Sequence, residues 1–171
     1  MINLNFRRLL VATVITALCG QAGAAVYNNG SNTATFEVTM GLVANCSVTA
    51  AAMNFGARVG VLTAAVNATS DIKVTCTNTT PFNLGLNEGT GAGSSGTTRY
   101  LSGTGSNTAK VQFNLSQSSG GSLWGNTQGT DTLGGTGNGS EQTLTVYGQI
   151  PAQASPAPDT YKSTITATVY F

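Results

Sequence analysis

The chain has 171 residues and only 8% of them are charged, whereas an ordinary soluble domain has roughly 25%. Two of its seven basic residues, Arg7 and Arg8, lie in a leader that we expect to be removed, which leaves five basic against six acidic residues. No basic cluster is present to bind a phosphate backbone, so nucleic acid is excluded as a partner. Histidine is absent and the carboxylates show neither pairing nor metal-ligand spacing, so we predict no enzyme, no metal site and no cofactor.

The first 24 residues have the pattern of a secretory signal peptide. Arg7 and Arg8 form its positive region, and the apolar run from Leu9 to Cys19 is too short to span a bilayer. The small residues of Gln21-Ala22-Gly23-Ala24 predict cleavage after Ala24 and export from the cytoplasm. The mature chain is then predicted to have an N-terminal extension over residues 25–44 and one domain over residues 45–171.

The segment from Thr35 to Leu42 alternates polar and apolar residues, which predicts a strand with one apolar face. Its apolar face comprises Phe36, Val38, Met40 and Leu42. Such a strand at the start of the mature protein can pair with its own domain or be offered to another molecule.

Two cysteines, Cys46 and Cys76, remain after the signal is removed, and only one pairing is open to them. In an exported chain they predict a structural disulfide, which closes a loop of about thirty residues and contributes roughly 3–4 kcal/mol. Each alternates with apolar neighbours, so both sulfur atoms are expected to point into a core. A catalytic cysteine is not supported, since no histidine exists to lower its pKa.

The rest of the chain consists of short alternating runs separated by Gly, Ser, Thr and Asn, without any helical period, which predicts a sandwich of two antiparallel sheets. Residues 116–142 would form a long loop, and Trp124 is expected to pin it to the core. A sugar-stacking role for Trp124 with Tyr100 or Tyr147 is the less favoured interpretation. Gly91 to Gly96 match a nucleotide-binding spacing, but no helix follows to receive a phosphate. Strands are expected at Ile72–Cys76, Phe82–Leu86, Val111–Leu115, Leu144–Val146 and Tyr161–Phe171.

The order of several short motifs resembles the spore coat protein U domain, which builds the subunits of archaic, Csu-type chaperone-usher pili. The most specific motifs are Tyr147-Gly148-Gln149-Ile150-Pro151-Ala152-Gln153 and the C-terminal run that ends in Tyr170-Phe171. Further matching motifs are Asn45-Cys46-Ser47-Val48, Met53-Asn54-Phe55-Gly56, Ile72 to Thr77, Phe82 to Gly89, Arg99-Tyr100-Leu101, Phe113-Asn114-Leu115 and Leu123-Trp124-Gly125.

The resemblance implies an all-β fold, an incomplete immunoglobulin-like β-sandwich that is completed by a donor strand from another subunit. A groove would then run along the C-terminal strand, and a periplasmic chaperone would fill it until an outer-membrane usher exchanges it for the next subunit's N-terminal strand. Phe36, Val38, Met40 and Leu42 would be the donor residues, and the product would be a surface fibre of identical or related pilin subunits that supports adhesion and biofilm formation. The acceptor and chaperone-binding strand would comprise Tyr161, Ile165, Ala167, Val169, Tyr170 and Phe171, with Tyr161, Ile165, Ala167, Val169 and Phe171 turned inward.

Three other functions are less favoured. A tip adhesin of the same family usually carries an additional domain and no free donor strand. A secreted enzyme lacks a nucleophile and base pair in this sequence. A non-fimbrial secreted coat protein of the same family is the remaining alternative.

Overall fold

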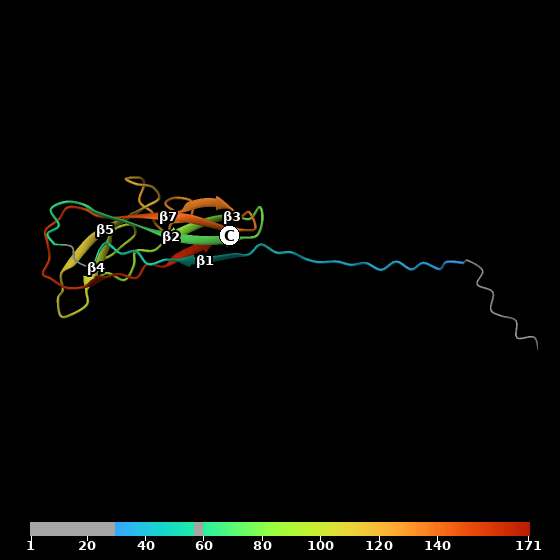
Figure 1. Ribbon diagram of the computed structural model, residues 1–171, viewed down its shortest axis with the longest axis horizontal. Helices are drawn as coiled ribbons and strands as arrows, with labels where there is room; N and C mark the ends of the chain where they lie inside the picture. The colour runs from blue at the N-terminus through green and yellow to red at the C-terminus, as the bar shows by residue number, and fades with distance from the viewer. Residues whose placement is uncertain (1–29, 57–59) are drawn as a thin grey trace, which may run out of the picture. The chain divides into compact units, whose positions relative to one another are not determined.

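A computed structural model describes residues 30–56 and 60–171 (Figure 1). The predicted signal peptide lies outside these residues. The chain divides into two units, one ending at Met40 and one from Gly41 to Phe171, and each is considered by itself. Within the first unit, residues 30–40 belong to no helix or β-ladder in the part of the chain that is described.

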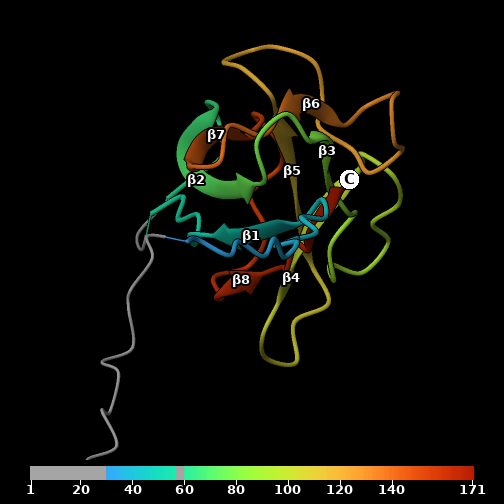
Figure 2. The same ribbon diagram turned by 90° about the vertical axis from the view of Figure 1, so that its right-hand side faces the viewer.

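The second unit is built from strands alone in its described residues, and all of its strand pairs are antiparallel. Six strands form one sheet in the order β1-β2-β7-β5-β4-β8, and three form the other in the order β6-β3-β9 (Figures 1 and 2). This confirms the predicted all-β fold. The strands are β1 (Cys46–Ala50), β2 (Val66–Cys76), β3 (Pro81–Leu86), β4 (Arg99–Gly103), β5 (Lys110–Ser116), β6 (Leu133–Thr136), β7 (Glu141–Ile150), β8 (Tyr161–Lys162) and β9 (Ala167–Tyr170).

The core consists of the alternate side chains that the strands turn inward, as a period of two requires. On β2, for example, Ile72, Val74 and Cys76 are buried while the residues between them are exposed. Cys46 lies opposite Cys76 in the β1–β2 register, and the two form the expected disulfide. The remaining buried apolar residues are Leu62, Phe82, Leu84, Leu86, Val111, Phe113, Leu115, Trp124, Val146 and Ile150.

The long loop predicted over residues 116–142 contains a strand that its sequence does not indicate. β6 pairs with β3 although Gly134 and Gly135 carry no strand signal. Gly135 lies against the ring of Phe82, where the Cβ of any other residue would collide. Glycine here therefore serves close packing rather than a turn. Trp124 is fully buried, as predicted for the residue that pins this loop.

The predicted C-terminal strand, Tyr161–Phe171, is wrong as one continuous element. β8 pairs with β4 in the six-stranded sheet, and β9 pairs with β3 in the three-stranded sheet, so residues 163–166 cross from one sheet to the other. Phe171 was expected to point inward, but it is 58% exposed. It follows the last residue of β9 and takes part in no β-ladder among the described residues.

Candidate functional site

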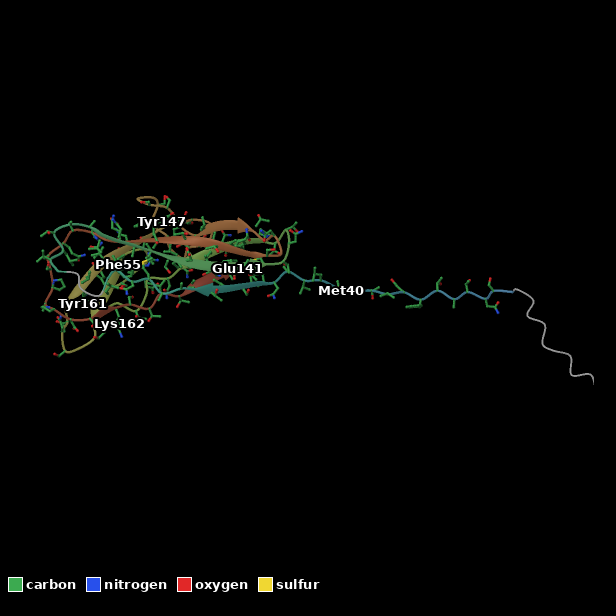
Figure 3. The ribbon with its side chains drawn as sticks, viewed as in Figure 1. Met40, Phe55, Glu141, Tyr147, Tyr161 and Lys162 are labelled. Carbon is green, nitrogen blue, oxygen red and sulfur yellow. A yellow bond between two sulfur atoms is a disulfide. The ribbon has the colours of Figure 1, made fainter. Side chains whose placement is uncertain are left out.

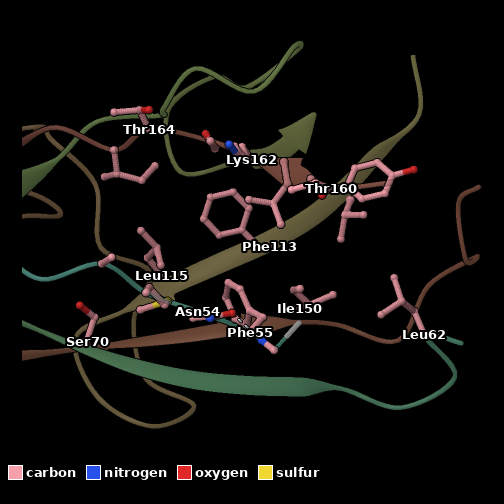
Figure 4. A pocket seen from close by; sticks show the side chains of 18 of the residues that line it. Asn54, Phe55, Leu62, Ser70, Phe113, Leu115, Ile150, Thr160, Lys162 and Thr164 are labelled. Atoms are coloured by element: carbon pink, nitrogen blue, oxygen red, sulfur yellow. Dashed lines mark hydrogen bonds between the residues drawn. The ribbon is translucent and has the colours of Figure 1, made fainter. Parts of the chain in front are cut away.

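An open groove of about 1140 Å³ lies along the inner face of the six-stranded sheet (Figure 4). Residues 50–56 and 60–62 form part of its lining, and residues 155–165 with Ala167 form another part. A groove of this volume exceeds the roughly 300–1,000 Å³ of small-molecule sites. The core side chains that line it are Ile72, Leu86, Leu101, Val111, Phe113, Leu115, Val146 and Ile150.

The lining formed by residues 50–56 places an aromatic pair in the groove. The rings of Phe55 and Phe113 meet edge to face, with centroids 6.3 Å apart, and both appear in Figure 4. Met53 and Phe55 reach this position because β7 has glycine at Gly148, where a Cβ would collide with both side chains. The motif that contains Gly148 therefore contributes to the shape of the groove.

The opposite lining is held by hydrogen bonds to the neighbouring loop. The Tyr161 hydroxyl donates to the carbonyl oxygen of Ala157 at 2.6 Å and accepts a hydrogen bond from Asn107 Nδ2, also at 2.6 Å. Leu62 N donates to Ser155 Oγ at 2.7 Å, which ties together two parts of the lining that are far apart in sequence. These bonds keep the groove walls in place without filling the space between them.

The crossing segment, residues 163–166, has hydrogen-bond partners along one side of its backbone. Both backbone groups of Thr166 bond to Asn87, and both of Thr164 bond to Thr90. In an extended chain, alternate residues direct their backbone groups to opposite sides, so those of Ile165 point away from this partner. On the side away from Asn87 and Thr90, the backbone can therefore pair with an additional strand.

The structure brings together most of the predicted acceptor residues. Tyr161, Ile165 and Ala167 line the groove, and Val169 packs against the same core. Tyr170 turns the other way, and its hydroxyl lies 3.1 Å from Asn126 Oδ1. Phe171 does not line the groove.

Sequence reasoning missed Arg99, whose side chain is completely buried. Its Nη2 donates to the carbonyl oxygens of Leu86 at 2.8 Å and Trp124 at 2.7 Å, and its Nε donates to that of Asn87 at 2.9 Å. Burial lowers the pKa of Arg99 to about 10, against the opposing attraction of Asp131 and then Glu88. Arg99 therefore remains a cation at neutral pH. The sequence signal is weak, because a single arginine at the start of a short strand reads as an exposed residue.

The predicted donor segment presents its apolar side chains to solvent in the described structure. Phe36, Val38 and Met40 are between 81% and 86% exposed, and Leu42, in the second unit, is 79% exposed. Residues 35–42 take part in no β-ladder within the described part of the chain, so the predicted strand has no partner there. Apolar side chains in such an alternating row are unusual on a soluble chain unless they serve binding.

Neither a metal centre nor a membrane helix is found in the described residues. No group of three or more His, Cys, Asp or Glu residues there could hold a metal ion. The same residues contain no helix that is long and apolar enough to cross a membrane. Within residues 30–56 and 60–171 we take the groove as the candidate functional site.

Comparisons with known proteins agree with this architecture. Among solved structures, the chain is similar to the crystal structure of the CsuC-CsuE chaperone-tip adhesion subunit pre-assembly complex from archaic chaperone-usher Csu pili of Acinetobacter baumannii. The TM-score is 0.56 at 18% identity, over 76% of this chain and 40% of the matched chain, so the likeness concerns the fold alone and this chain spans about two fifths of that one. No curated protein matches the sequence. The family model of the Spore Coat Protein U domain matches residues 32–168, and the chain therefore belongs to the Spore Coat Protein U domain family.

Proposed function

We propose that this protein is a structural subunit of a chaperone-usher pilus and that subunits join by donor-strand exchange. The N-terminal segment of one subunit, with Phe36, Val38, Met40 and Leu42, enters the groove of the next. The chain then acts as a building block and not as an enzyme. Its mature form comprises a donor extension over residues 25–44 and a sandwich domain over residues 45–171.

The observation that carries this proposal is a groove lined by core side chains in a chain that also has an unpaired amphipathic segment. Ile165 and Ala167 border the groove, and the adjacent edge of β9 is not paired to another strand in the described residues. A donor strand would satisfy the free backbone groups and cover the apolar lining in one step. Each of its four apolar side chains would gain about 1.5–3 kcal/mol on burial.

Assembly follows from the geometry of such an exchange. Each subunit gives a strand to one neighbour and receives one from another, so the contact is heterologous and produces an open fibre. A periplasmic chaperone would protect the groove before assembly, and an outer-membrane usher would exchange chaperone for donor. We place the product on the cell surface, where a fibre supports adhesion and biofilm formation.

Charge substitutions in the donor segment test this proposal. Changing Val38 and Met40 to Asp would bury unpaired charges in the next subunit, at a cost of several kcal/mol each. The altered subunit is expected to co-purify with its chaperone, since that contact uses its own groove, but to form no fibre. The matched control changes Glu37 to Gln and Thr39 to Ser on the polar face, and should assemble normally.

Fibre yield after shearing, counted by electron microscopy, and chaperone co-purification are the two measurements. Equal loss of fibres from the polar-face control would contradict the proposal. Loss of chaperone binding together with fibres would show that the segment belongs to the subunit's own sandwich.

A further inference from the structure

A second recess of about 550 Å³ lies on the opposite, outer face of the six-stranded sheet, over β2, β7 and β5. Gln149 on β7 stands between Asn67 and Asn114 in the strand registers, and Tyr147 stands between Thr69 and Ser116. The two rows are two residues apart along each strand, so their side chains share one face. Leu115, between Asn114 and Ser116, is buried on the inner face, which fixes this orientation.

The rim of the recess is a short hairpin whose base is set by the buried Trp124. Trp124 N donates to the carbonyl oxygen of Leu115 at 2.8 Å, and Gln117 N donates to that of Ser122 at 3.2 Å. Ser119, Gly120, Gly121 and Leu123 of this hairpin line the recess. The hairpin therefore forms one side of the recess, and the buried Trp124 fixes its base to the core.

The chemistry of the lining is polar and uncharged. Gln149 Nε2 donates to Asn67 Oδ1 at 3.0 Å, which leaves the Gln149 oxygen and the Asn67 amide hydrogens available. Asn114 and Tyr147 make no side-chain hydrogen bond with any described residue, and Tyr147 is only partly buried. No lining residue carries a charge.

We propose that this recess binds a neutral saccharide. A sugar ring has an apolar face of C–H groups that can pack on the Tyr147 ring, and hydroxyl groups that each donate and accept hydrogen bonds. Amide side chains match such hydroxyls because they offer a donor and an acceptor on one planar group. The absence of a lysine or arginine among the lining residues argues against an acidic sugar or a phosphate as the ligand.

The site is separate from the groove and does not depend on the proposed function. Tyr147 and Tyr161, which mark the recess and the groove, are labelled at different parts of the molecule in Figure 3. In a fibre every subunit would repeat the recess, so weak binding at each site would add up through multivalency.

The test uses the purified mature chain, labelled with ¹⁵N and titrated with methyl glycosides of glucose, galactose, mannose and N-acetylglucosamine. We expect at least one to give saturable shifts at Tyr147, Asn114 and Gln149. Tyr147→Ala should raise the dissociation constant about tenfold, because the sugar loses its contact with an aromatic ring. Thr143→Ala, on the same strand and face but outside the recess, is the matched control and should change nothing.

Asn114→Ala provides a second variant if Tyr147→Ala does not fold, and it should weaken binding severalfold. The proposal is overturned if none of the glycosides shifts these signals, or if Tyr147→Ala and Thr143→Ala behave alike. It is also overturned if the same signals shift with protein concentration alone, because the recess would then be a contact between copies of the chain.

Discussion

Replacing Arg99 by Met should destabilise the domain strongly, because it removes the donors for two buried carbonyl oxygens and one partly buried one. Those of Leu86, Asn87 and Trp124 would be left unpaired, and each unsatisfied buried group costs about 1–3 kcal/mol. The substitution also relieves the cost of burying the cation. The lowering of the Arg99 pKa to about 10 corresponds to about 3 kcal/mol of that cost. At about 2 kcal/mol for each of the three groups the loss is about 6 kcal/mol, and the relief of about 3 kcal/mol leaves an expected net loss of unfolding free energy of about 3 kcal/mol.

Arg99→Lys distinguishes the charge from the fork-shaped guanidinium. A lysine keeps the charge but cannot reach carbonyl oxygens on two different segments in the same geometry, so it should not restore stability. Lys73→Met is the control, since Lys73 is paired with Glu141 at 2.7 Å but both side chains are about half exposed. Its unfolding free energy should stay within experimental error, because an exposed pair contributes little.

Urea unfolding with the disulfide intact measures these differences, and the fluorescence of Trp124 provides the signal. Trp124 is the single tryptophan of the chain, and its Nε1 donates to the carbonyl oxygen of Leu84 at 2.7 Å. Its emission therefore reports on the same cluster. The reasoning fails if Arg99→Met changes the unfolding free energy by less than about 0.5 kcal/mol, or if Arg99→Lys matches the natural chain.

Four further results are expected. Thiol counting on the denatured mature protein should find no free sulfhydryl, and replacing both disulfide cysteines by Ser should cost about 3–4 kcal/mol in urea unfolding. Trp124→Phe, followed by circular dichroism, should cost about 1–3 kcal/mol because the Leu84 carbonyl oxygen loses its donor. Gly137→Ala should cost about 1–3 kcal/mol because its Cβ would collide with the Thr77 carbonyl oxygen, whereas Gly41→Ala meets nothing and should be neutral. The melting temperature should be nearly constant from about pH 6 to 8, since the chain has no histidine to titrate in that range.

Several features of the fold follow directly from alternation along the chain. The disulfide could be predicted because two cysteines permit one pairing and both stand in apolar alternation. The inner faces of β2 and β5 could be predicted for the same reason, since buried and exposed residues alternate along them. Local alternation determines which side of a strand is apolar, and that information is contained in a few neighbouring residues.

Features that depend on distant partners could not be predicted in this way. β2 begins at Val66, six residues before the expected start, because β7 supplies a partner for a run that has little strand signal of its own. Arg99 reads as a surface residue until the ends of β3 and the Trp124 loop are brought to it. The outer recess likewise depends on three strands being in register, since Tyr147 and Asn114 are far apart in sequence.

The groove depends on how many neighbours a strand has, which the sequence pattern of that strand does not contain. Alternation places the side chains of Ile165, Ala167 and Val169 inward, and the structure agrees, but it cannot say whether a strand has one neighbour or two. Only the complete pairing shows that β9 is hydrogen-bonded to β3 along one edge and to no strand along the other in the described residues. The proposed donor requires an apolar face and no ladder of its own, and residues 35–42 meet both conditions in the described part of the chain. The donor hypothesis therefore rests on two independent observations. One is the edge of β9 that has no hydrogen-bonded strand, and the other is the alternating segment of residues 35–42 that belongs to no sheet in the described part of the chain.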